Sequence, residues 1–345
     1  MQFIFWILIY GFIFGFAEED DFFYKEKMTH KQISRDRIVK FEGLLKEFRQ
    51  EIQSKIGDFE RPYTLVKIGL DNLGILPDFQ DKKATKVLFH ENSAPFSEDF
   101  DVILPLPKSK EDLNRLSDCE FFDVVIVTNL VYSLEDDWAS KLQKIISMGY
   151  LTFIVVPPKF INHNIDMAEI QRFIPKGIDF EILKTDVMQR FQSKVILCKQ
   201  ERKRLLTNHI LGKKKELISY EIFANKKEAT FKKIFLENGV VNHSLFLPGI
   251  NLLTFLYFDG SKPSSNDLKK NLMQIRYQRH SDFMPHNMII NNKGLFLIDF
   301  GDWRCSMPKE ESNRSYIDKN RLDILFKMID SRQKKFLEEK ILGGF

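Results

Sequence analysis

The chain has 345 residues, which is long enough for two domains that each bury a hydrophobic core. Its 52 basic and 48 acidic residues leave a formal net charge of +4, so the composition does not indicate a nucleic-acid-binding surface. The cysteines Cys119, Cys198 and Cys305 form no CxxC pair and no zinc-ligand spacing, so we expect buried thiols rather than a metal site or a disulfide framework.

Residues 2–17 form an uncharged apolar run that ends abruptly at four acidic residues. Such a run is short for a membrane span and within the range of a signal-peptide core. Gly15 and Ala17 fit a signal-peptidase site with cleavage after Ala17, although no Lys or Arg precedes the run. We predict that residues 1–17 are a signal peptide that routes the protein to the secretory pathway. An uncleaved membrane anchor and a buried helix are the alternatives.

The next two regions have different periodicities. Residues 28–56 repeat apolar side chains at steps of three and four, which predicts an amphipathic helix that packs on a core. Residues 60–200 alternate short β-rich runs with helical patterns, which is typical of an α/β domain with a mainly parallel sheet. We expect strands at residues 65–68, 86–89, 102–104, 123–128, 151–156 and 194–198, and a helix at 136–147.

The segment from Phe122 to Leu130, with its Phe-Asp-Val-Val start, the helix after it and the strand before Pro157-Pro158, resembles the second half of class I (Rossmann-like) methyltransferases. The resemblance covers about residues 60–200 and implies that S-adenosylmethionine binds at the carboxyl ends of the strands. Gly69 and Gly74, which follow the first strand, and Glu91, which follows the second, are the implied cofactor-binding residues. The Gly-rich turn of the family is reduced here to these two glycines, so a fold kept for packing without its cofactor is the alternative.

Residues 201–215 carry a basic run that we expect to be a solvated linker. After it, residues 217–223 and 229–235 could pair as a hairpin with Lys232 and Lys233 on its second strand. Lys232 is the candidate for contacting nucleotide phosphates, and an exposed lysine on a strand edge is the alternative. The sequence contains no Gly-rich nucleotide-binding loop.

The clearest chemical pattern lies between residues 280 and 302. A strand at 288–290, a turn at 291–294 and a strand at 295–298 predict a hairpin that brings Asn287 and Asp299, at its open ends, close together. Their amide and carboxylate oxygens could share one Mg²⁺, and Asp282 could accept the proton of an attacking hydroxyl. The pattern therefore indicates phosphoryl transfer. A hairpin with ordinary capping Asp and Asn residues is the alternative.

The run from His280 through Asp282 and Pro285 to Asn287, followed by Asp299-Phe-Gly-Asp, resembles the catalytic and metal loops of the protein-kinase-like superfamily. It is most similar to the aminoglycoside and choline phosphotransferases. The resemblance implies that Asp282 is the catalytic base, that Asn287 and Asp299 bind Mg²⁺, and that His280 braces the loop. It also implies ATP or another nucleotide as donor and a small molecule or carbohydrate as acceptor.

The kinase-like resemblance is specific over about residues 243–303. Residues 212–345 would then be a truncated kinase-like α+β domain. It would include a hinge at 247–253, a helix at 267–279 before the catalytic loop, and closing helices at 318–329 and 331–341.

Both resemblances together are those of the bifunctional kinase–methyltransferases that cap bacterial polysaccharide chains. We predict an α/β, Rossmann-like, mainly parallel sheet domain followed by the kinase-like domain, with Mg²⁺-dependent phosphoryl transfer to a hydroxyl of a sugar or small molecule. An S-adenosylmethionine-dependent methyltransferase and a membrane-routed scaffold without activity are the alternatives. We expect no nucleic-acid partner.

Overall fold

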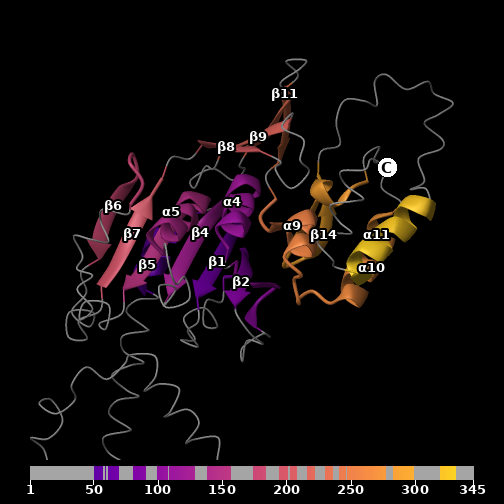
Figure 1. Ribbon diagram of the computed structural model, residues 1–345, viewed down its shortest axis with the longest axis horizontal. Coiled ribbons are helices and arrows are strands. Elements are labelled where there is room, and N and C mark those ends of the chain that lie inside the picture. Colours follow the sequence, from indigo (N-terminus) through magenta and orange to yellow (C-terminus); the bar gives the residue numbers. More distant parts are fainter. Residues whose placement is uncertain are drawn as a thin grey trace, which may run out of the picture.

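A computed structural model describes much of the chain between residues 50 and 331. The described residues are 50–56, 59, 61–69, 81–90, 99–107, 109–128, 138–156, 174–183, 194–200, 203–207, 216–221, 230–235, 241–245, 247–276, 283–298 and 319–331. They form a seven-stranded sheet, a four-stranded sheet and a three-stranded sheet, with helices packed against them (Figure 1).

The seven-stranded sheet has the order β3-β2-β1-β4-β5-β7-β6. Strands β1 to β5 run parallel, whereas β7 is antiparallel to both of its neighbours. The bounds are β1 Tyr63–Gly69, β2 Ala84–His90, β3 Val102–Pro105, β4 Phe122–Thr128, β5 Gly149–Val156, β6 Asp179–Leu183 and β7 Lys194–Lys199. The order 3-2-1-4-5 is that of a Rossmann-like sheet. The predicted fold class, with a Rossmann-like and mainly parallel sheet, is therefore confirmed.

The central strands form because they are apolar enough to be covered on both faces. All seven residues of β1 are buried, which is typical of a parallel strand between two layers. Helices α4 (Lys110–Cys119) and α5 (Trp138–Met148) pack against each other over one face of the sheet (Figure 1). Residues 50–56 are helical with Ile52 and Ile56 buried, which confirms the end of the predicted amphipathic helix.

The four-stranded sheet is antiparallel, with the order β11-β10-β9-β8. Its strands are β8 Lys203–Thr207, β9 Glu216–Glu221, β10 Thr230–Phe235 and β11 Val241–Leu245. The predicted hairpin is therefore confirmed as β9 and β10. The predicted basic linker is wrong at residues 203–207, which pair with β9. An antiparallel ladder is made by backbone groups, so it can include a strand whose side chains carry no apolar pattern.

The remaining elements surround the predicted catalytic hairpin. They are β12 Ile250–Asn251, α9 Leu252–Tyr257, α10 Ser265–Ile275, the 3-10 helix η4 Pro285–Asn287, β13 Met288–Asn291, β14 Gly294–Leu297 and α11 Lys319–Ser331. Strand β13 pairs with β12 on one side and with β14 on the other. The predicted hairpin, the predicted helix before it and the first predicted closing helix are confirmed, whereas residues 332–341 of the second closing helix lie outside the described residues. In Figure 1, α9, α10, α11 and β14 lie beside the β1–β2 end of the large sheet.

The methyltransferase-like sheet and the kinase-like elements share one hydrophobic core. A single cluster of buried side chains extends from the strands through α9 and the hairpin to α11. Residues 261 and 262 also cover the free edge of β3, because Ile103 N donates to Lys262 O and Ser261 N donates to Ile103 O, both at 2.9 Å. At the hairpin turn, Asn292 Nδ2 donates to Ala84 O at 3.0 Å. The two parts therefore form one packed unit.

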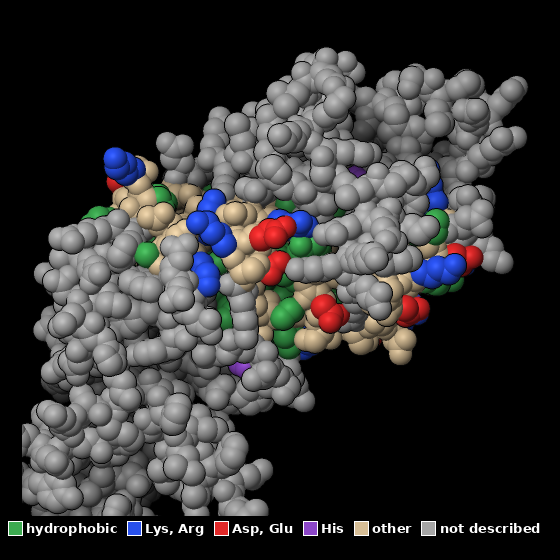
Figure 2. Space-filling view, viewed as in Figure 1, with side chains coloured by type: hydrophobic (Ala, Val, Ile, Leu, Met, Phe, Trp, Pro, Cys, Tyr) green, Lys and Arg blue, Asp and Glu red, His purple; other side chains and the backbone are tan. Residues whose placement is uncertain are grey.

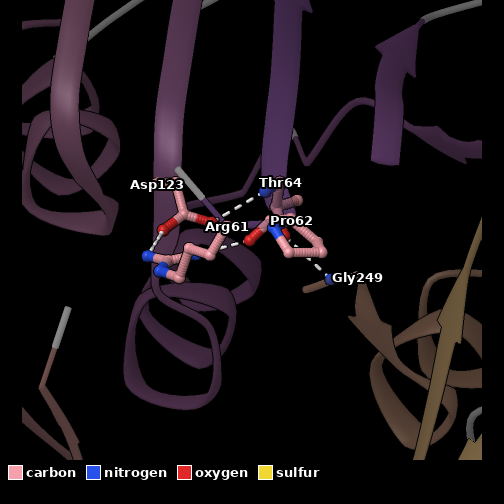
Figure 3. A network of polar contacts seen from close by, with 5 residues as sticks. All are labelled: Arg61, Pro62, Thr64, Asp123 and Gly249. Carbon is pink, nitrogen blue, oxygen red and sulfur yellow. Dashed lines mark hydrogen bonds and ion pairs between the residues drawn. The ribbon is translucent and has the colours of Figure 1, made fainter. Parts of the chain in front are cut away.

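A polar network ties the amino ends of β1 and β4 to the segment before α9 (Figure 3). Arg61 pairs with Asp123, and the exposed fractions of these two side chains are 2% and 0%. The second oxygen of Asp123 accepts a hydrogen bond from Thr64 N at 2.7 Å. The Thr64 hydroxyl in turn accepts one from Gly249 N at 2.8 Å. Gly249 has φ +142°, and an added Cβ would lie 2.1 Å from Ile290 O, so only glycine fits there.

The structure tests the predicted buried thiols in part and does not describe the predicted signal peptide. Cys198 is buried, and burial raises the pKa of its thiol to about 12, so the expected buried thiol is confirmed there. Cys119 is half-buried and Cys305 lies outside the described residues. Among the helices of the described part, none has the length and apolar character needed to cross a membrane, and residues 1–17 are not in that part.

Candidate functional site

Asn287 is the predicted metal ligand whose surroundings the structure describes. It ends η4 and directly precedes β13, and it is 2% exposed. Its backbone N–H donates to Met284 O at 2.9 Å, and its carbonyl accepts from Ile298 N at 2.8 Å. Because both backbone groups are paired in a buried position, the position of Asn287 is fixed.

The hairpin brings the two ends of the predicted site together. Met288 pairs with Leu297, and the bond from Ile298 N to Asn287 O extends the ladder by one more residue. Asp299 follows Ile298 directly in the chain. Asp299 itself lies outside the described residues, as do Asp282 and His280. The structure therefore shows that Asn287 lies beside Ile298, the residue before Asp299.

The segment that follows Asp282 is anchored in the core. Phe283, the next residue, is 1% exposed, and Pro285 is also buried. Pro285 occupies the first position of η4, where its fixed φ suits a helical turn and its missing N–H is not needed. Two buried side chains thus hold the backbone between Asp282 and Asn287.

Asn251 is a residue of this site that the sequence patterns did not single out. Its Oδ1 accepts from Leu253 N at 2.9 Å and caps α9. Its Nδ2 donates to the carbonyl of His286 at 2.7 Å. An Asn before the apolar run 252–257 is a recognisable helix-start signal, but the bond to His286, 35 residues away, has no signature in the sequence.

Glu120 contacts the same residue from the methyltransferase-like part. It caps the end of α4, is 4% exposed, and accepts a hydrogen bond from Asn251 N at 3.1 Å. Burial raises the pKa of this carboxyl to about 7, and the interactions with Thr254 and with the backbone of Asn251 only partly offset that effect. A carboxyl in this position changes its charge near neutral pH.

Lys232, the candidate phosphate lysine, lies on an inner strand. Its backbone pairs with Ser219 of β9 and with His243 of β11. β10 is therefore flanked on both sides, and the alternative of a lysine on a strand edge is wrong. The backbone around Lys232 is thus paired with a neighbouring strand on both sides, unlike that of an edge strand.

The second candidate site lies at the carboxyl ends of β1 and β2. Gly69 ends β1 with φ +142°, a conformation that favours glycine, and it pairs with Thr128 of β4. Glu91 directly follows His90, the last residue of β2, and β2 is the parallel neighbour of β1. Gly74 and Glu91 lie outside the described residues. In sheets of this type, ligands bind in the crevice outside the carboxyl ends of the strands.

Within the described part of the chain, no three His, Cys, Asp or Glu side chains are grouped as metal ligands. Of the predicted Mg²⁺ ligands, this part includes only Asn287. Figure 2 shows basic and acidic side chains interspersed over the described part of the face it presents. This mixture agrees with the near balance of charge in the sequence.

Comparisons with known proteins find similarity at the level of structure. No protein-family model matches the sequence, and no curated protein matches it. The chain is similar to the bifunctional kinase-methyltransferase WbdD, at 12% identity and a TM-score of 0.31 over 87% of each chain. It is similar to a TehB-like SAM-dependent methyltransferase from Corynebacterium glutamicum, at 12% identity and a TM-score of 0.32 over 47% of this chain and 98% of that one. For the plantazolicin methyltransferase BpumL in complex with SAH, the identity is 13% and the TM-score 0.33, over 50% of this chain and 90% of that one.

Proposed function

We propose that the protein is a Mg²⁺-dependent phosphotransferase that transfers a nucleotide phosphoryl group to a hydroxyl of a sugar or small molecule. The observation that carries this proposal is the hydrogen bond from Ile298 N to Asn287 O. This bond holds the residue before Asp299 against Asn287, which is the arrangement that two ligands of one metal ion need.

The residue types fit such a site. The Asn287 amide oxygen and the Asp299 carboxylate are hard oxygen donors of the kind that Mg²⁺ prefers, and the remaining positions would be filled by water and phosphate oxygens. A bound Mg²⁺ would neutralise charge on the nucleotide phosphates. Asp282 would accept the proton of the acceptor hydroxyl, His280 would brace the loop, and Lys232 would contact the phosphates.

The test replaces Asp282 in the full chain. Asp282→Asn keeps the size of the side chain and removes its ability to accept a proton, so we expect turnover of Mg-ATP to fall at least about 100-fold. Asp323→Asn is the matched control, because Asp323 is an exposed carboxylate on α11. Hydrolysis and transfer are followed by release of the nucleoside diphosphate with a panel of sugars as acceptors. Turnover by Asp282→Asn equal to that of the control would contradict the proposal.

A second candidate function is S-adenosylmethionine-dependent methyl transfer. The order of the seven-stranded sheet and the positive φ of Gly69 at the end of β1 favour it. Calorimetric titration of the full chain with S-adenosylmethionine tests this candidate, and the absence of binding heat at millimolar cofactor would dismiss it. If neither this cofactor nor Mg-nucleotide shifts the melting temperature, the scaffold alternative is favoured.

A further inference from the structure

Asn251 lies where the methyltransferase-like part, helix α9 and the η4 segment meet. We propose that Asn251 is a positioning residue for the phosphotransferase site, and that Glu120 holds Asn251 in place. The methyltransferase-like part would then support the phosphotransferase site, whether or not it binds a cofactor of its own. This inference rests on the proposed function, and its test separates the two.

The hydrogen bonds of Asn251 fix the peptide group that precedes Asn287. The carbonyl of that peptide belongs to His286 and accepts from Asn251 Nδ2 at 2.7 Å. Its N–H belongs to Asn287 and donates to Met284 O at 2.9 Å. The next peptide is held as well, because the Asn287 carbonyl accepts from Ile298 N. With both flanking peptides held, the side chain of Asn287 starts from a fixed backbone, as a metal ligand requires.

Asn251 is itself held from the side of the large sheet. Glu120 Oε1 accepts from Asn251 N at 3.1 Å, across 131 positions in the sequence. On α4, five residues before Glu120, the guanidinium of Arg115 lies 5.0 Å from the ring centre of Tyr257 on α9. The contact of Glu120 reaches the β12–α9 junction, and that of Arg115 reaches the carboxyl end of α9. They therefore orient Asn251 without touching the reacting groups.

The key variant is Asn251→Ser. Serine still caps α9, because its hydroxyl can accept from Leu253 N, but it has no amide to donate to His286 O. We expect the melting temperature to fall about as much as on loss of a helix cap, because the His286 carbonyl loses this donor, and the apparent Kd for Mg-ATP to rise about tenfold, the equivalent of one lost hydrogen bond. Ser264→Ala is the matched control, since it removes the cap of α10 in the same part of the molecule. The control should lose stability and bind Mg-ATP as the wild type does.

Hydrogen exchange gives a readout that does not depend on nucleotide. In Asn251→Ser, the amide of Asn287 should exchange about tenfold faster, while the amides of α10 keep their wild-type rates. Glu120→Gln keeps an acceptor for Asn251 N and should behave as the wild type, whereas Glu120→Ala should resemble Asn251→Ser. Unchanged exchange at Asn287 together with wild-type affinity in Asn251→Ser would overturn the positioning role.

The two proposals fail in different ways. If the wild type binds no Mg-nucleotide, the proposed function is wrong, and faster exchange at Asn287 in Asn251→Ser still supports a role of Asn251 in holding that segment. If the wild type turns over Mg-ATP and Asn251→Ser does so with equal Kd and equal exchange, the function stands and the positioning role is overturned.

Discussion

At the scale of single residues, the Arg61–Asp123 pair shows how a buried charge can be tolerated. Both side chains are almost completely removed from water. Asp123 accepts from Arg61 and from Thr64 N, while Arg61 also donates to Pro62 O at 2.6 Å and lies over the ring of Phe59. Desolvation costs several kcal/mol per ion, so a pair like this is stable only when its hydrogen bonds are made.

We expect Asp123→Asn to lower the free energy of unfolding by about 3–5 kcal/mol, because it leaves the Arg61 guanidinium buried without a counter-charge. Urea unfolding followed by circular dichroism measures the change. Asp330→Asn is the comparison, because it breaks the exposed pair between Lys269 and Asp330 and should cost about 1 kcal/mol or less. Equal losses in the two variants would show that burial of the first pair does not matter.

At the scale of elements, the segment before α9 depends on one close backbone approach. Gly249 lies against strand β13 so tightly that its missing side chain is what allows β12 and β13 to pair. Its N–H is bonded to Thr64 at the start of β1, so the same residue also joins the two parts of the molecule. A change at Gly249 therefore disturbs the hairpin that precedes Asp299.

We predict that Gly249→Ala lowers the free energy of unfolding by about 2–5 kcal/mol, since it adds a steric overlap to an unfavourable φ. Gly177→Ala is the matched control. Gly177 also has a positive φ, at +87°, but has no atom within 4 Å of an added Cβ. The control should cost about 1–2 kcal/mol, the backbone contribution alone. Thermal unfolding of both variants measures the difference, and equal losses would contradict the close approach.

The elements that could be predicted from the sequence are those with a regular apolar pattern. Strands β1, β2, β4 and β5 are mainly apolar runs, and the hairpin after Asn287 has a turn between two such runs. Strand β6 escaped prediction because most of its residues are exposed, and helix α4 because its sequence is mainly polar. The contacts of Asn251 with Glu120 and His286 join distant parts of the chain, so no local pattern contains them.

At the scale of the whole molecule, the shared core makes the stability of the two parts interdependent. Glu120 lies at their junction as a buried carboxyl whose pKa is raised to about 7 by burial. The folded state therefore binds this proton more tightly than the unfolded state, whose carboxyl has its ordinary pKa of 4.5. The contribution of Glu120 to stability is fully present below pH 4.5 and is lost as the pH rises to 7.

We expect Glu120→Gln to remove this pH dependence. Relative to the wild type, the free energy of unfolding of Glu120→Gln should increase by about 3 kcal/mol between pH 4.5 and pH 8. Urea unfolding of both proteins at a series of pH values measures the difference. Parallel stability curves for the two proteins across this range would contradict a raised pKa at Glu120.

Three contacts of the kinase-like elements lie at the amino ends of the parallel strands, on Thr64, Ala84 and the Glu120 that precedes β4. Ligands of such a sheet bind at the opposite, carboxyl ends, about 20 Å away along a strand of this length. A ligand bound at the carboxyl ends would thus lie at the opposite end of the sheet from the contacts that hold the segment before α9 and the hairpin turn.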